Sequence, residues 1–487
     1  MNVHPDYIVI GAGSAGSVLA RRLTDDGSAT VLLLEAGHDA RPDVIRNPAH
    51  WASLIGSEFD WGFDTQPQSG LDGRVLAYPR GKVTGGSSST NGVVHIRALE
   101  SDITPWVERG ATRWSYDRLL PFMDRSERSE APDAPDRGGV HVSRPFPPSP
   151  VVTAVERAMG EDARITHVGM HLMSVQGMDR SSAADGYLTP ATRERPNLTL
   201  RADTTVSRLV FEGLRCVGVE VLGPHGTEVL RAHREVILSA GVVGSPHLLM
   251  VSGIGPAQQL QPSGIEVLLD APEVGANLQD HARGGVSCSV DPGLEYVGEG
   301  LSGLLSVDGR PVQLLFTGVP QFPAEMDGPG HGFTLTVTPM HPTSRGTLEL
   351  TGPSITDAPR IDPALLATNE DVDDMVAGIR AAREIIARAG LDAWDTREVL
   401  PGAAATSDED LQRYARQVTQ TYYHGIGTCR LGGDDGSVVD QELRVRGIQG
   451  LRVVDASVMP SLPSANPNPL VYAIAEYAAS MIRDATA

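Results

Sequence analysis

Lysine is almost absent from this sequence. Lys82 is the only lysine among 40 basic residues, so a mechanism that needs a lysine amine is excluded at every other position. The basic residues are outnumbered by 61 acidic ones, which gives a formal net charge of −21. Nucleic acids and anionic membranes attract basic surfaces, so neither is expected as the main partner.

Cysteine and long apolar runs are also scarce. The three cysteines, Cys216, Cys288 and Cys429, are odd in number and widely spaced, which argues against a disulfide framework and against a zinc or other metal site. No apolar run reaches the roughly 18 residues that a membrane helix needs. A strand that begins near Tyr7 leaves no room for a signal peptide. A cytoplasmic protein with no membrane partner is therefore predicted.

The first 37 residues have the pattern of a strand, a turn, a helix and a second strand. Tyr7–Ile10 and Val31–Leu34 are continuous apolar runs, which suit a parallel sheet covered on both faces. Between them, residues 16–23 place small and apolar side chains at helical spacing. The pattern predicts a βαβ unit at the N-terminus.

The rest of the chain shows further elements but no tandem repeat. Residues 131–150 are rich in Pro, Asp and Gly and indicate a loop that links two bodies. Strands are predicted within 198–222 and 234–240, a sheet within 311–340, and helices over 369–388 and 470–482. At roughly 150 residues per domain, the length of 487 residues alone predicts about three domains.

A glycine-rich turn joins the first strand to the first helix. Gly11 permits the tight turn, Gly13 lets the backbone approach a pyrophosphate, and Gly16 allows close packing of helix and strand. The helix N-terminus offers N–H groups and a positive dipole to the phosphates. Glu35 follows Gly16 by 19 residues, at the end of the next strand, where a carboxylate can accept a ribose hydroxyl. These features predict dinucleotide binding without separating FAD from NAD.

Five more motifs follow in order along the chain. They are Tyr78–Asn91, Ser239–Gly255, Val274–His281, His424–Arg430, and Asp455–Pro460 followed by Ser464–Asn468. Together with the glycine turn, they resemble the glucose–methanol–choline (GMC) family of flavin oxidoreductases from Tyr7 to Ile482. The resemblance implies FAD as cofactor and the oxidation of an alcohol to an aldehyde or ketone, with hydride transfer to flavin N5.

The resemblance also implies the architecture. It is an α/β fold in which a Rossmann-like FAD-binding domain is interleaved with an α+β substrate domain built on an antiparallel sheet. The expected FAD-binding domain comprises residues 1–148, 195–288 and 424–487, and the substrate domain comprises 149–194 and 289–423. The FAD-binding motifs occur at both ends and in the middle, so two interleaved bodies replace the three domains suggested by length.

Two residues match the catalytic pair of such enzymes, in the His–Asn form found in choline-oxidising members. His424 matches the histidine that faces the flavin ring, and Asn466 matches the residue opposite it before the last helix. Imidazole can accept the hydroxyl proton near neutral pH. An amide can hydrogen-bond the developing alkoxide. The alternative for Asn466 is a helix N-cap. The remaining histidines of interest, His95, His247, His281 and His341, are interpreted as structural.

The expected FAD contacts lie in or near four of the six motifs, and Val206 lies between them. Thr90 stands where some members attach FAD through a histidine, so the FAD is expected to be non-covalent. The expected contact set is Gly11, Gly13, Ser14, Ala15, Gly16, Glu35, Ala36, Val83, Gly86, Ser87, Asn91, Gly92, Val93, Val94, Val206, Ala240, Asp455, Ala456, Pro467 and Asn468.

The sequence leaves the substrate, the electron acceptor and the oligomeric state open. The pocket walls are expected mainly from residues 290–340 and 390–423. The acceptor is either oxygen or another carrier, and the second case includes a dehydrogenase linked to the redox cofactor mycofactocin. Two further hypotheses are a lyase of this family, whose FAD is not turned over, and an NAD(P)-dependent dehydrogenase.

Overall fold

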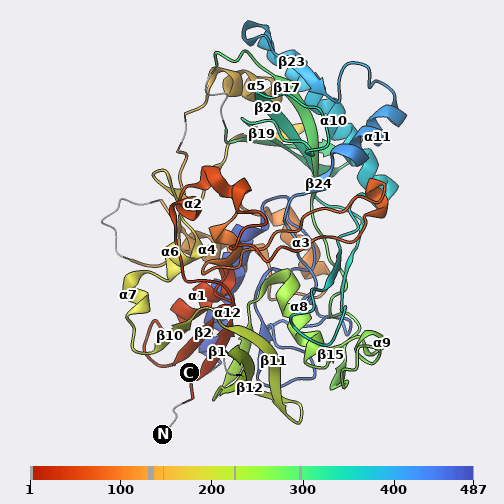
Figure 1. Cartoon of the computed structure of the whole chain (residues 1–487). Coiled ribbons are helices and arrows are strands. Elements are labelled where there is room, and N and C mark those ends of the chain that lie inside the picture. The colour runs from red at the N-terminus through yellow and green to blue at the C-terminus, as the bar shows by residue number, and fades with distance from the viewer. Residues whose placement is uncertain (1–3, 130–135, 146, 224–225, 295–298, 486–487) are drawn as a thin grey trace.

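The computed structural model describes residues 4–129, 136–145, 147–223, 226–294 and 299–485. A parallel sheet forms the core of the lower body in Figure 1, and an antiparallel sheet forms the core of the upper body. Segments from both ends and from the middle of the chain build the lower body, which therefore is not continuous in sequence.

The parallel sheet has five strands, and its first strand lies in the middle. The strand order is β10 (Leu198–Arg201), β2 (Val31–Leu34), β1 (Tyr7–Ile10), β14 (Glu235–Leu238) and β25 (Leu451–Val453). All four residues of β1 are buried, as expected for a strand covered on both faces. Helix α1 (Ser14–Leu23) packs on this sheet and against the last helix, α12 (Pro467–Asp484). An antiparallel ribbon, β11 (Thr205–Glu212), β12 (Arg215–Gly223) and β13 (Gly226–Arg231), lies beside β14.

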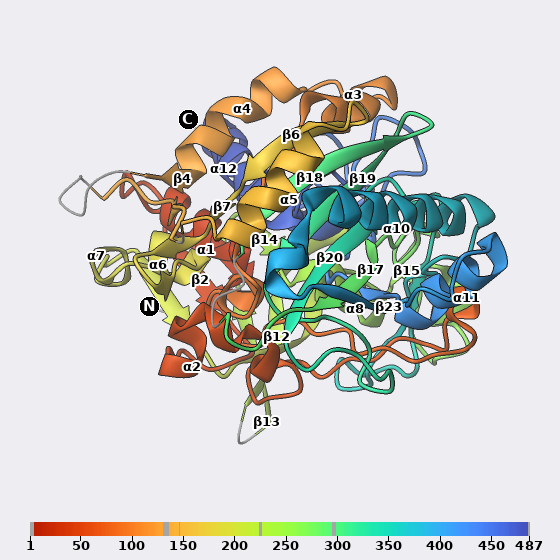
Figure 2. The same ribbon diagram turned by 90° about the horizontal axis from the view of Figure 1, so that it is seen from above.

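The antiparallel sheet has seven strands. Their order is β23 (Arg397–Leu400), β17 (Ala282–Ser289), β20 (Gly332–Pro339), β19 (Arg310–Thr317), β18 (Leu301–Val307) and β6 (Ile165–Met170), with β24 (Gln420–Thr421) also paired to β17. Helix α10 (Asn369–Ala389) lies across this sheet, as Figure 2 shows.

Side chains along β20 divide between the two faces of the antiparallel sheet. Val337 faces α10 so closely that a Cβ on Gly378 would lie 2.3 Å from its side chain. Because side chains alternate along a strand, Thr336 points away from α10, together with its cross-strand partners Leu315 and Gly285. This second face of the sheet is the one turned towards the functional site.

The remaining elements are shorter. The helices are α2 (Asp43–Arg46), α3 (Glu100–Glu108), α4 (Tyr116–Ser126), α5 (Pro150–Gly160), α6 (Ala183–Tyr187), α7 (Pro190–Arg193), α8 (Gly241–Val251), α9 (Ala257–Leu260) and α11 (Asp408–Val418). The two-stranded pairs are β3 (Val94–His95) with β7 (Leu172–Met173), β4 (Glu127–Arg128) with β5 (Val140–His141), β8 (Val175–Gln176) with β9 (Asp179–Arg180), β15 (Ile254–Gly255) with β16 (Leu269–Asp270), and β21 (Thr347–Glu349) with β22 (Arg360–Asp362). Among the described residues, no helix has the length and apolar character needed to cross a bilayer.

Most of the predicted elements are present at the predicted places. The N-terminal βαβ unit is confirmed, and the helix predicted over 369–388 is α10. The last helix begins at Pro467 rather than 470, because a proline is accommodated in the first helical turn. The predicted loop 131–150 lies partly outside the described residues, and α5 already begins at Pro150.

The domain boundaries remain a prediction. The core around the parallel sheet also contains Tyr187 and Leu188, from a segment expected in the substrate domain. Leu348 of β21 and its cross-strand partner Ile361 of β22 pack in that same core. The chain therefore crosses between the two bodies more often than the motifs alone indicate.

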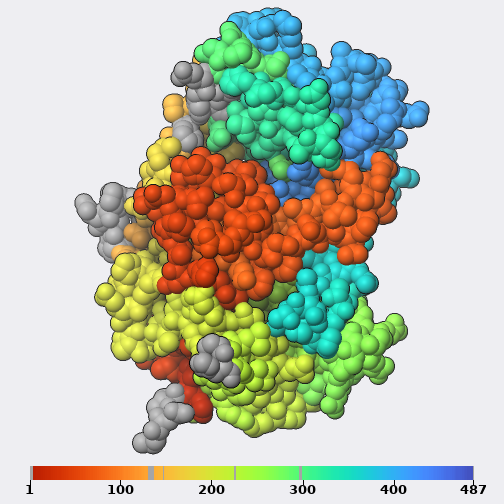
Figure 3. Space-filling view, viewed as in Figure 1, coloured from red at the N-terminus to blue at the C-terminus, as the bar shows by residue number. Residues whose placement is uncertain are grey.

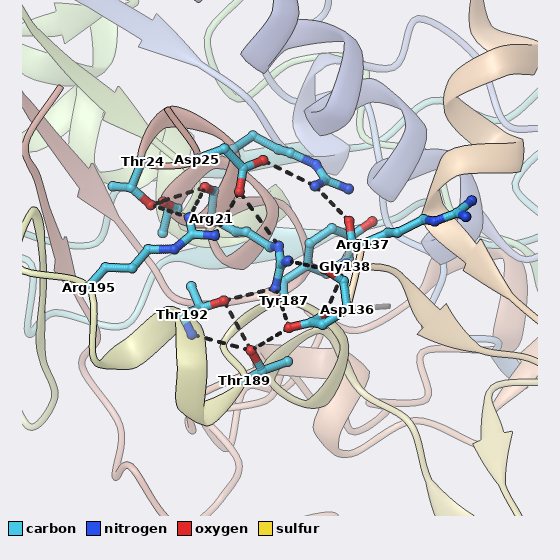
Figure 4. A network of polar contacts seen from close by, with 12 residues as sticks. Arg21, Thr24, Asp25, Asp136, Arg137, Gly138, Tyr187, Thr189, Thr192 and Arg195 are labelled. Carbon is cyan, nitrogen blue, oxygen red and sulfur yellow. Dashed lines mark hydrogen bonds and ion pairs between the residues drawn. The ribbon is translucent and has the colours of Figure 1, made fainter. Parts of the chain in front are cut away.

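A polar network fixes the C-terminal end of α1 (Figure 4). Arg21 Nη1 donates to Asp136 Oδ2 at 3.0 Å and to Thr192 Oγ1 at 2.8 Å. Arg195 Nη1 donates at 2.8 Å to the Arg21 carbonyl oxygen, which lies at the helix end and also accepts from Thr24 N. These contacts hold the axis of α1, and so determine where its N-terminus points.

A buried ion pair joins α1 to α12. Arg22 Nε and Nη2 donate to the two carboxylate oxygens of Glu476 at 2.7 and 2.6 Å. The Glu476 side chain is fully buried and also accepts from the Tyr187 hydroxyl at 3.0 Å. Such a bidentate pair in the interior fixes the relative position of the two helices.

Candidate active site

A cavity of about 910 Å³ lies between the two bodies. The glycine turn after β1 forms one wall, and the face of the antiparallel sheet that carries Leu315 and Thr336 forms another. Residues between Asn47 and Phe63 form a third wall. Figure 3 shows this N-terminal segment, in red to orange, crossing the middle of the molecule between the two bodies.

The glycine turn has the shape of an anion-binding loop. Gly11 has a φ of +95°, and a Cβ there would lie 2.5 Å from the Ser239 carbonyl oxygen. A Cβ on Gly16 would lie 1.8 Å from the Gly11 oxygen, so neither position accepts a side chain. Helix α1 has no side-chain cap and no acidic residue in its first turn. Its first N–H groups, which line the cavity at Ser14 and Ala15, are therefore available to a phosphate.

Glu35 lies at the end of β2, as predicted, and holds the glycine turn. Its carboxylate oxygens accept from the backbone N–H groups of Ala12 and Gly37, each at 2.8 Å. Burial raises the pKa of Glu35 to about 7, although the two N–H groups favour the charged form. Glu35 thus combines a structural role in the turn with a place on the cavity wall.

The loop expected beside the flavin ring has a strained backbone and is held by hydrogen bonds from a buried side chain. Val93, a buried β-branched residue, has a φ of +56°, a conformation that costs of order 1–3 kcal/mol. Arg180, a buried side chain, donates to the Asn91 carbonyl oxygen at 2.6 Å and to Asn91 Oδ1 at 2.8 Å. Arg180 therefore holds the loop in place, a role that no sequence motif indicated.

Asp455 lines the cavity, but its side chain is already fully used within the protein. One oxygen accepts from Gly241 N at 2.9 Å and from Ser245 Oγ, and the other accepts from Ser457 N at 2.8 Å. Only the main chain of Asp455 is therefore available to contact a bound group. Asn468, also an expected contact, accepts from Ser14 Oγ at 2.6 Å and so joins the N-termini of α12 and α1.

His424 and Asn466 lie side by side on the cavity wall. His424 Nε2 is 3.1 Å from Asn466 Nδ2. On its other side, His424 Nδ1 is 2.8 Å from His281 Nδ1, and His281 Nε2 is 2.9 Å from the Met340 carbonyl oxygen. Asn466 occupies the N-cap position of α12 but makes no side-chain capping bond, since its amide is directed to His424.

These contacts determine the tautomers of both histidines. A carbonyl oxygen can only accept, so His281 Nε2 carries a hydrogen and donates to Met340. Burial lowers the pKa of His281 to about 3, so its ring is neutral and its Nδ1 is an acceptor. His424 must then donate from Nδ1, which leaves His424 Nε2 without a hydrogen and able to accept one from Asn466 Nδ2.

The electrostatics of His424 keep its ring neutral. Burial lowers the pKa of His424 well below its usual value. The neighbouring His281 ring lowers that pKa further, and so do the positive charges of Arg80 and Arg283. A neutral ring with a free Nε2 lone pair can act as a base at physiological pH.

The backbone around His424 is held by the neighbouring strand pair. Asp280 Oδ1 accepts from His424 N at 2.7 Å, and the preceding residue, Tyr423, has a φ of +64°. The ring of Tyr422 lies over that of His424, with ring centroids 4.3 Å apart. Imidazole orientation is thus fixed by the main chain on one side and by an aromatic ring on the other.

Nearly all of the predicted site residues meet on this cavity. Gly16 and Val83 do not line it: Gly16 packs behind the turn, and Val83 packs against Ile45 and Phe59. The predicted residues that do line it are Gly11, Gly13, Ser14, Ala15, Glu35, Ala36, Gly86, Ser87, Asn91, Gly92, Val93, Val94, Val206, Ala240, His424, Asp455, Ala456, Asn466, Pro467 and Asn468.

The expected walls need a correction. No described residue of 390–421 lines the cavity, because this part of the chain packs on β17 and around α10. The segment 47–63 lines it instead, and it has no periodicity from which this could be read. His281, interpreted as structural, contacts His424 directly; the signal that could have found it is its place at the end of the Val274–His281 motif.

The cavity fits a large group with phosphates and polar ring atoms. Five buried polar atoms of residues on its wall have no hydrogen-bond partner among the described residues: Arg80 Nε and Nη2, His171 Nδ1, His247 Nε2 and Asn466 Oδ1. The uncapped start of α1 offers donors at one end, and the wall also carries His424 and Asn466. These features match a dinucleotide that extends from the glycine turn towards His424, which is the shape of FAD.

Comparisons with known proteins agree with this geometry. Two sequence models described as "GMC oxidoreductase" match the chain, one over residues 5–283 and the other over residues 342–475. Choline oxidase of Arthrobacter globiformis is 38% identical, over 99% of this chain and 95% of its own length. Alcohol dehydrogenase [acceptor] of Pseudomonas putida is 35% identical, over 98% of this chain and 95% of its own.

A solved structure agrees as well. Pyridoxine 4-oxidase of Mesorbium loti superposes with a TM-score of 0.92 at 33% sequence identity. The superposition covers 98% of this chain and 99% of that one, so both bodies and their relative placement are shared.

Proposed function

This chain belongs to the GMC oxidoreductase family, and we propose that His424 is its catalytic base and Asn466 the donor to the reacting oxygen. It is an FAD-dependent oxidoreductase that oxidises CH–OH donors. The observation that carries the proposal is the pairing of a hydrogen-free His424 Nε2 with Asn466 Nδ2 at 3.1 Å on the cavity wall.

The residues have separate tasks in the reaction. When bound, FAD accepts the hydride that leaves the alcohol carbon. His424 Nε2 takes the hydroxyl proton, and Asn466 Nδ2 donates to the oxygen as it becomes negative. His281 acts as a positioning residue, since its Nδ1 accepts from His424 Nδ1 and so keeps the free lone pair on Nε2. The Tyr422 ring limits rotation of the imidazole.

We infer that FAD is held without a covalent bond. The glycine turn, with Ser14 and Ala15 at the start of α1, would hold the pyrophosphate, and Glu35 lies where a ribose hydroxyl can be bound. Thr90, which lines the cavity, has no nucleophilic ring nitrogen for attachment to the flavin. Acid precipitation should therefore release all of the flavin, and flavin retained on the polypeptide would contradict this assignment.

A single anaerobic experiment tests the proposed function. Alcohols of different classes are mixed with the oxidised holoenzyme, bleaching of the flavin is followed, and oxygen is then admitted. Bleaching identifies the alcohol class, and the rate of reoxidation tells whether oxygen or another carrier is the acceptor. A flavin that stays oxidised with every alcohol would instead support chemistry without redox turnover, as in a lyase.

Glu35→Ala should weaken FAD binding by about 10- to 100-fold, because it leaves the buried N–H groups of Ala12 and Gly37 without acceptors. The dissociation constant is measured by titrating FAD into the apoprotein and following the quenching of flavin fluorescence. Glu212→Ala, at an exposed position of β11, is the matched control. An unchanged dissociation constant in Glu35→Ala would show that the carboxylate does not contribute to FAD binding. The rate of flavin reduction in the reconstituted variant should change much less than the affinity for FAD.

The rate of flavin reduction should be independent of pH above about 6.5. The base is active only when neutral, and the pKa of His424 lies well below its usual value, so protonation should reduce the rate only on the acid side. Stopped-flow reduction at saturating alcohol measures this profile. An activating limb centred above pH 7 would contradict the lowered pKa of His424, and its persistence in His424→Ala would show that His424 is not the group that titrates.

A further inference from the structure

The cavity wall carries four acidic side chains, described below, and three cationic ones. Three cationic side chains line the cavity, Arg80, Lys82 and Arg283, while the whole chain carries a formal charge of −21. Lys82 is the only lysine in the sequence. A site with this charge distribution selects among substrates by the sign of their charge.

Three of the six aromatic side chains that line the cavity lie next to these cations. Lys82 Nζ lies 5.0 Å from the ring centroid of Trp61. Arg283 Cζ lies 5.9 Å from that of Tyr422 and 5.7 Å from that of Tyr423. An aromatic wall normally attracts a cationic ligand through the faces of its rings. Here the rings of Trp61, Tyr422 and Tyr423 already lie beside the protein's own cations, so a quaternary ammonium group at any of these three rings would meet like charge.

Arg283, like Arg80, lies close to the reacting residues. It lies on β17, and alternation along that strand places it on the same face as Gly285, opposite the face covered by α10. The ring of Tyr422 contacts both groups: its centroid is 4.3 Å from that of His424, and Arg283 Cζ lies above it. The charge of Arg283 also contributes to the lowered pKa of His424.

Arg283 is not neutralised within the protein. Its Nε donates to the Thr421 carbonyl oxygen at 3.3 Å and its Nη1 to Gln321 Oε1, both uncharged acceptors. No ion pair to Arg283 is formed by any described residue, and its Nη2 has no hydrogen-bond partner among them. A guanidinium with a free N–H edge on a cavity wall is a binding group for a carboxylate or another oxyanion.

The acidic residues of the cavity are engaged elsewhere. Asp60 accepts from the backbone N–H groups of Arg80 and Gly56, at 2.8 and 2.9 Å. Glu35 and Asp455 hold backbone and hydroxyl donors at the glycine turn and at α8, as described above. Burial raises the pKa of Glu299, which favours its neutral form, and no ion pair joins it to Arg283 in the described part of the chain.

We propose that Arg283 binds an anionic group of the substrate, so that the enzyme oxidises alcohols carrying a carboxylate or a similar oxyanion and discriminates against cationic alcohols. The inference rests on the proposed function, because it places the reacting hydroxyl at His424. It also separates this chain from the relative named choline oxidase, since choline carries a quaternary ammonium group.

The test uses the holoenzyme and three matched series of alcohols. Hydroxycarboxylates of increasing chain length are compared with neutral diols and with amino alcohols of the same length, by kcat/KM for flavin reduction. The best hydroxycarboxylate should exceed its matched diol, and Arg283→Gln should lower the hydroxycarboxylate value by about 10- to 100-fold more than the diol value. Arg283→Glu should reverse the order in favour of the amino alcohol.

A binding measurement accompanies the kinetics. Alkanecarboxylates, which have no hydroxyl to oxidise, are titrated by calorimetry into wild-type enzyme, Arg283→Gln and Arg283→Lys. Binding should be lost in the first variant and largely retained in the second, which keeps the charge. Arg118→Gln, an exposed position on α4 outside the cavity, controls for the loss of one positive charge.

The outcomes separate the two proposals. If Arg283→Gln lowers flavin reduction equally for all three series, Arg283 acts on the reaction centre and anion recognition is overturned. Equal binding of alkanecarboxylates by wild type and Arg283→Gln overturns it too. If no alcohol reduces the flavin, the proposed function fails, but charge-dependent carboxylate binding still decides the role of Arg283.

Discussion

Replacing His424 by alanine is expected to slow anaerobic reduction of the flavin by roughly 10²–10⁴-fold. The reason is the loss of Nε2, the one hydrogen-free ring nitrogen beside Asn466. FAD should remain bound, because the glycine turn and Glu35 are separate from His424. Stopped-flow absorbance with an alcohol found active in the anaerobic panel measures the rate.

Two controls sharpen the His424 result. Free imidazole should restore part of the rate in His424→Ala, since it can enter the space left by the side chain and accept the proton. His233→Ala, an exposed histidine far from the cavity, should leave the rate unchanged. An unchanged rate in His424→Ala would remove this residue from the mechanism, whatever the flavin content of the variant.

Glu476→Leu is expected to cost about 3–5 kcal/mol of stability, because it leaves the buried Arg22 guanidinium with only the partly exposed Asp25 as an ion-pair partner. The Tyr187 hydroxyl loses its acceptor in the same variant. Denaturant unfolding of the apoprotein should show a lower midpoint with little change in slope. Arg22→Met combined with Glu476→Leu should recover most of the loss, since the charges are then removed together.

An exposed pair between the same parts of the chain is the matched control. Arg483 Nη2, on α12, lies 2.5 Å from Asp26 Oδ2, shortly after α1, and both side chains are about two-fifths exposed. Asp26→Ala should therefore change stability by no more than about 1 kcal/mol. If Asp26→Ala and Glu476→Leu lower the stability equally, burial of the Arg22–Glu476 pair has no special effect on stability.

The sequence predicted those parts of the fold that depend on local pattern. The apolar runs of β1 and β2 contain no polar residue, and a strand buried on both faces is the structure that such runs favour. The stripe of Val372, Met375 and Ile379 likewise predicts α10. The resemblance to a family supplied the interleaved architecture, which no local pattern contains.

The candidate site was predictable only where its residues stand in motifs. Glu35 lies at the predicted place because the end of a strand next to the glycine turn has one geometry. Arg283 and Arg180 act through contacts with residues that are distant in the sequence, Tyr422 and Asn91. Such pairings arise from tertiary packing, and neither spacing nor composition records them.

The position of β1 in the middle of its sheet also bears on how the protein is made. Its neighbour β14 and the edge strand β25 come from the middle and the end of the chain, and α12, which begins directly after Asn466, packs on α1. A growing chain therefore presents the glycine turn long before its partners have been translated. We expect the nascent protein to rely on chaperones, and flavin uptake to follow release from the ribosome.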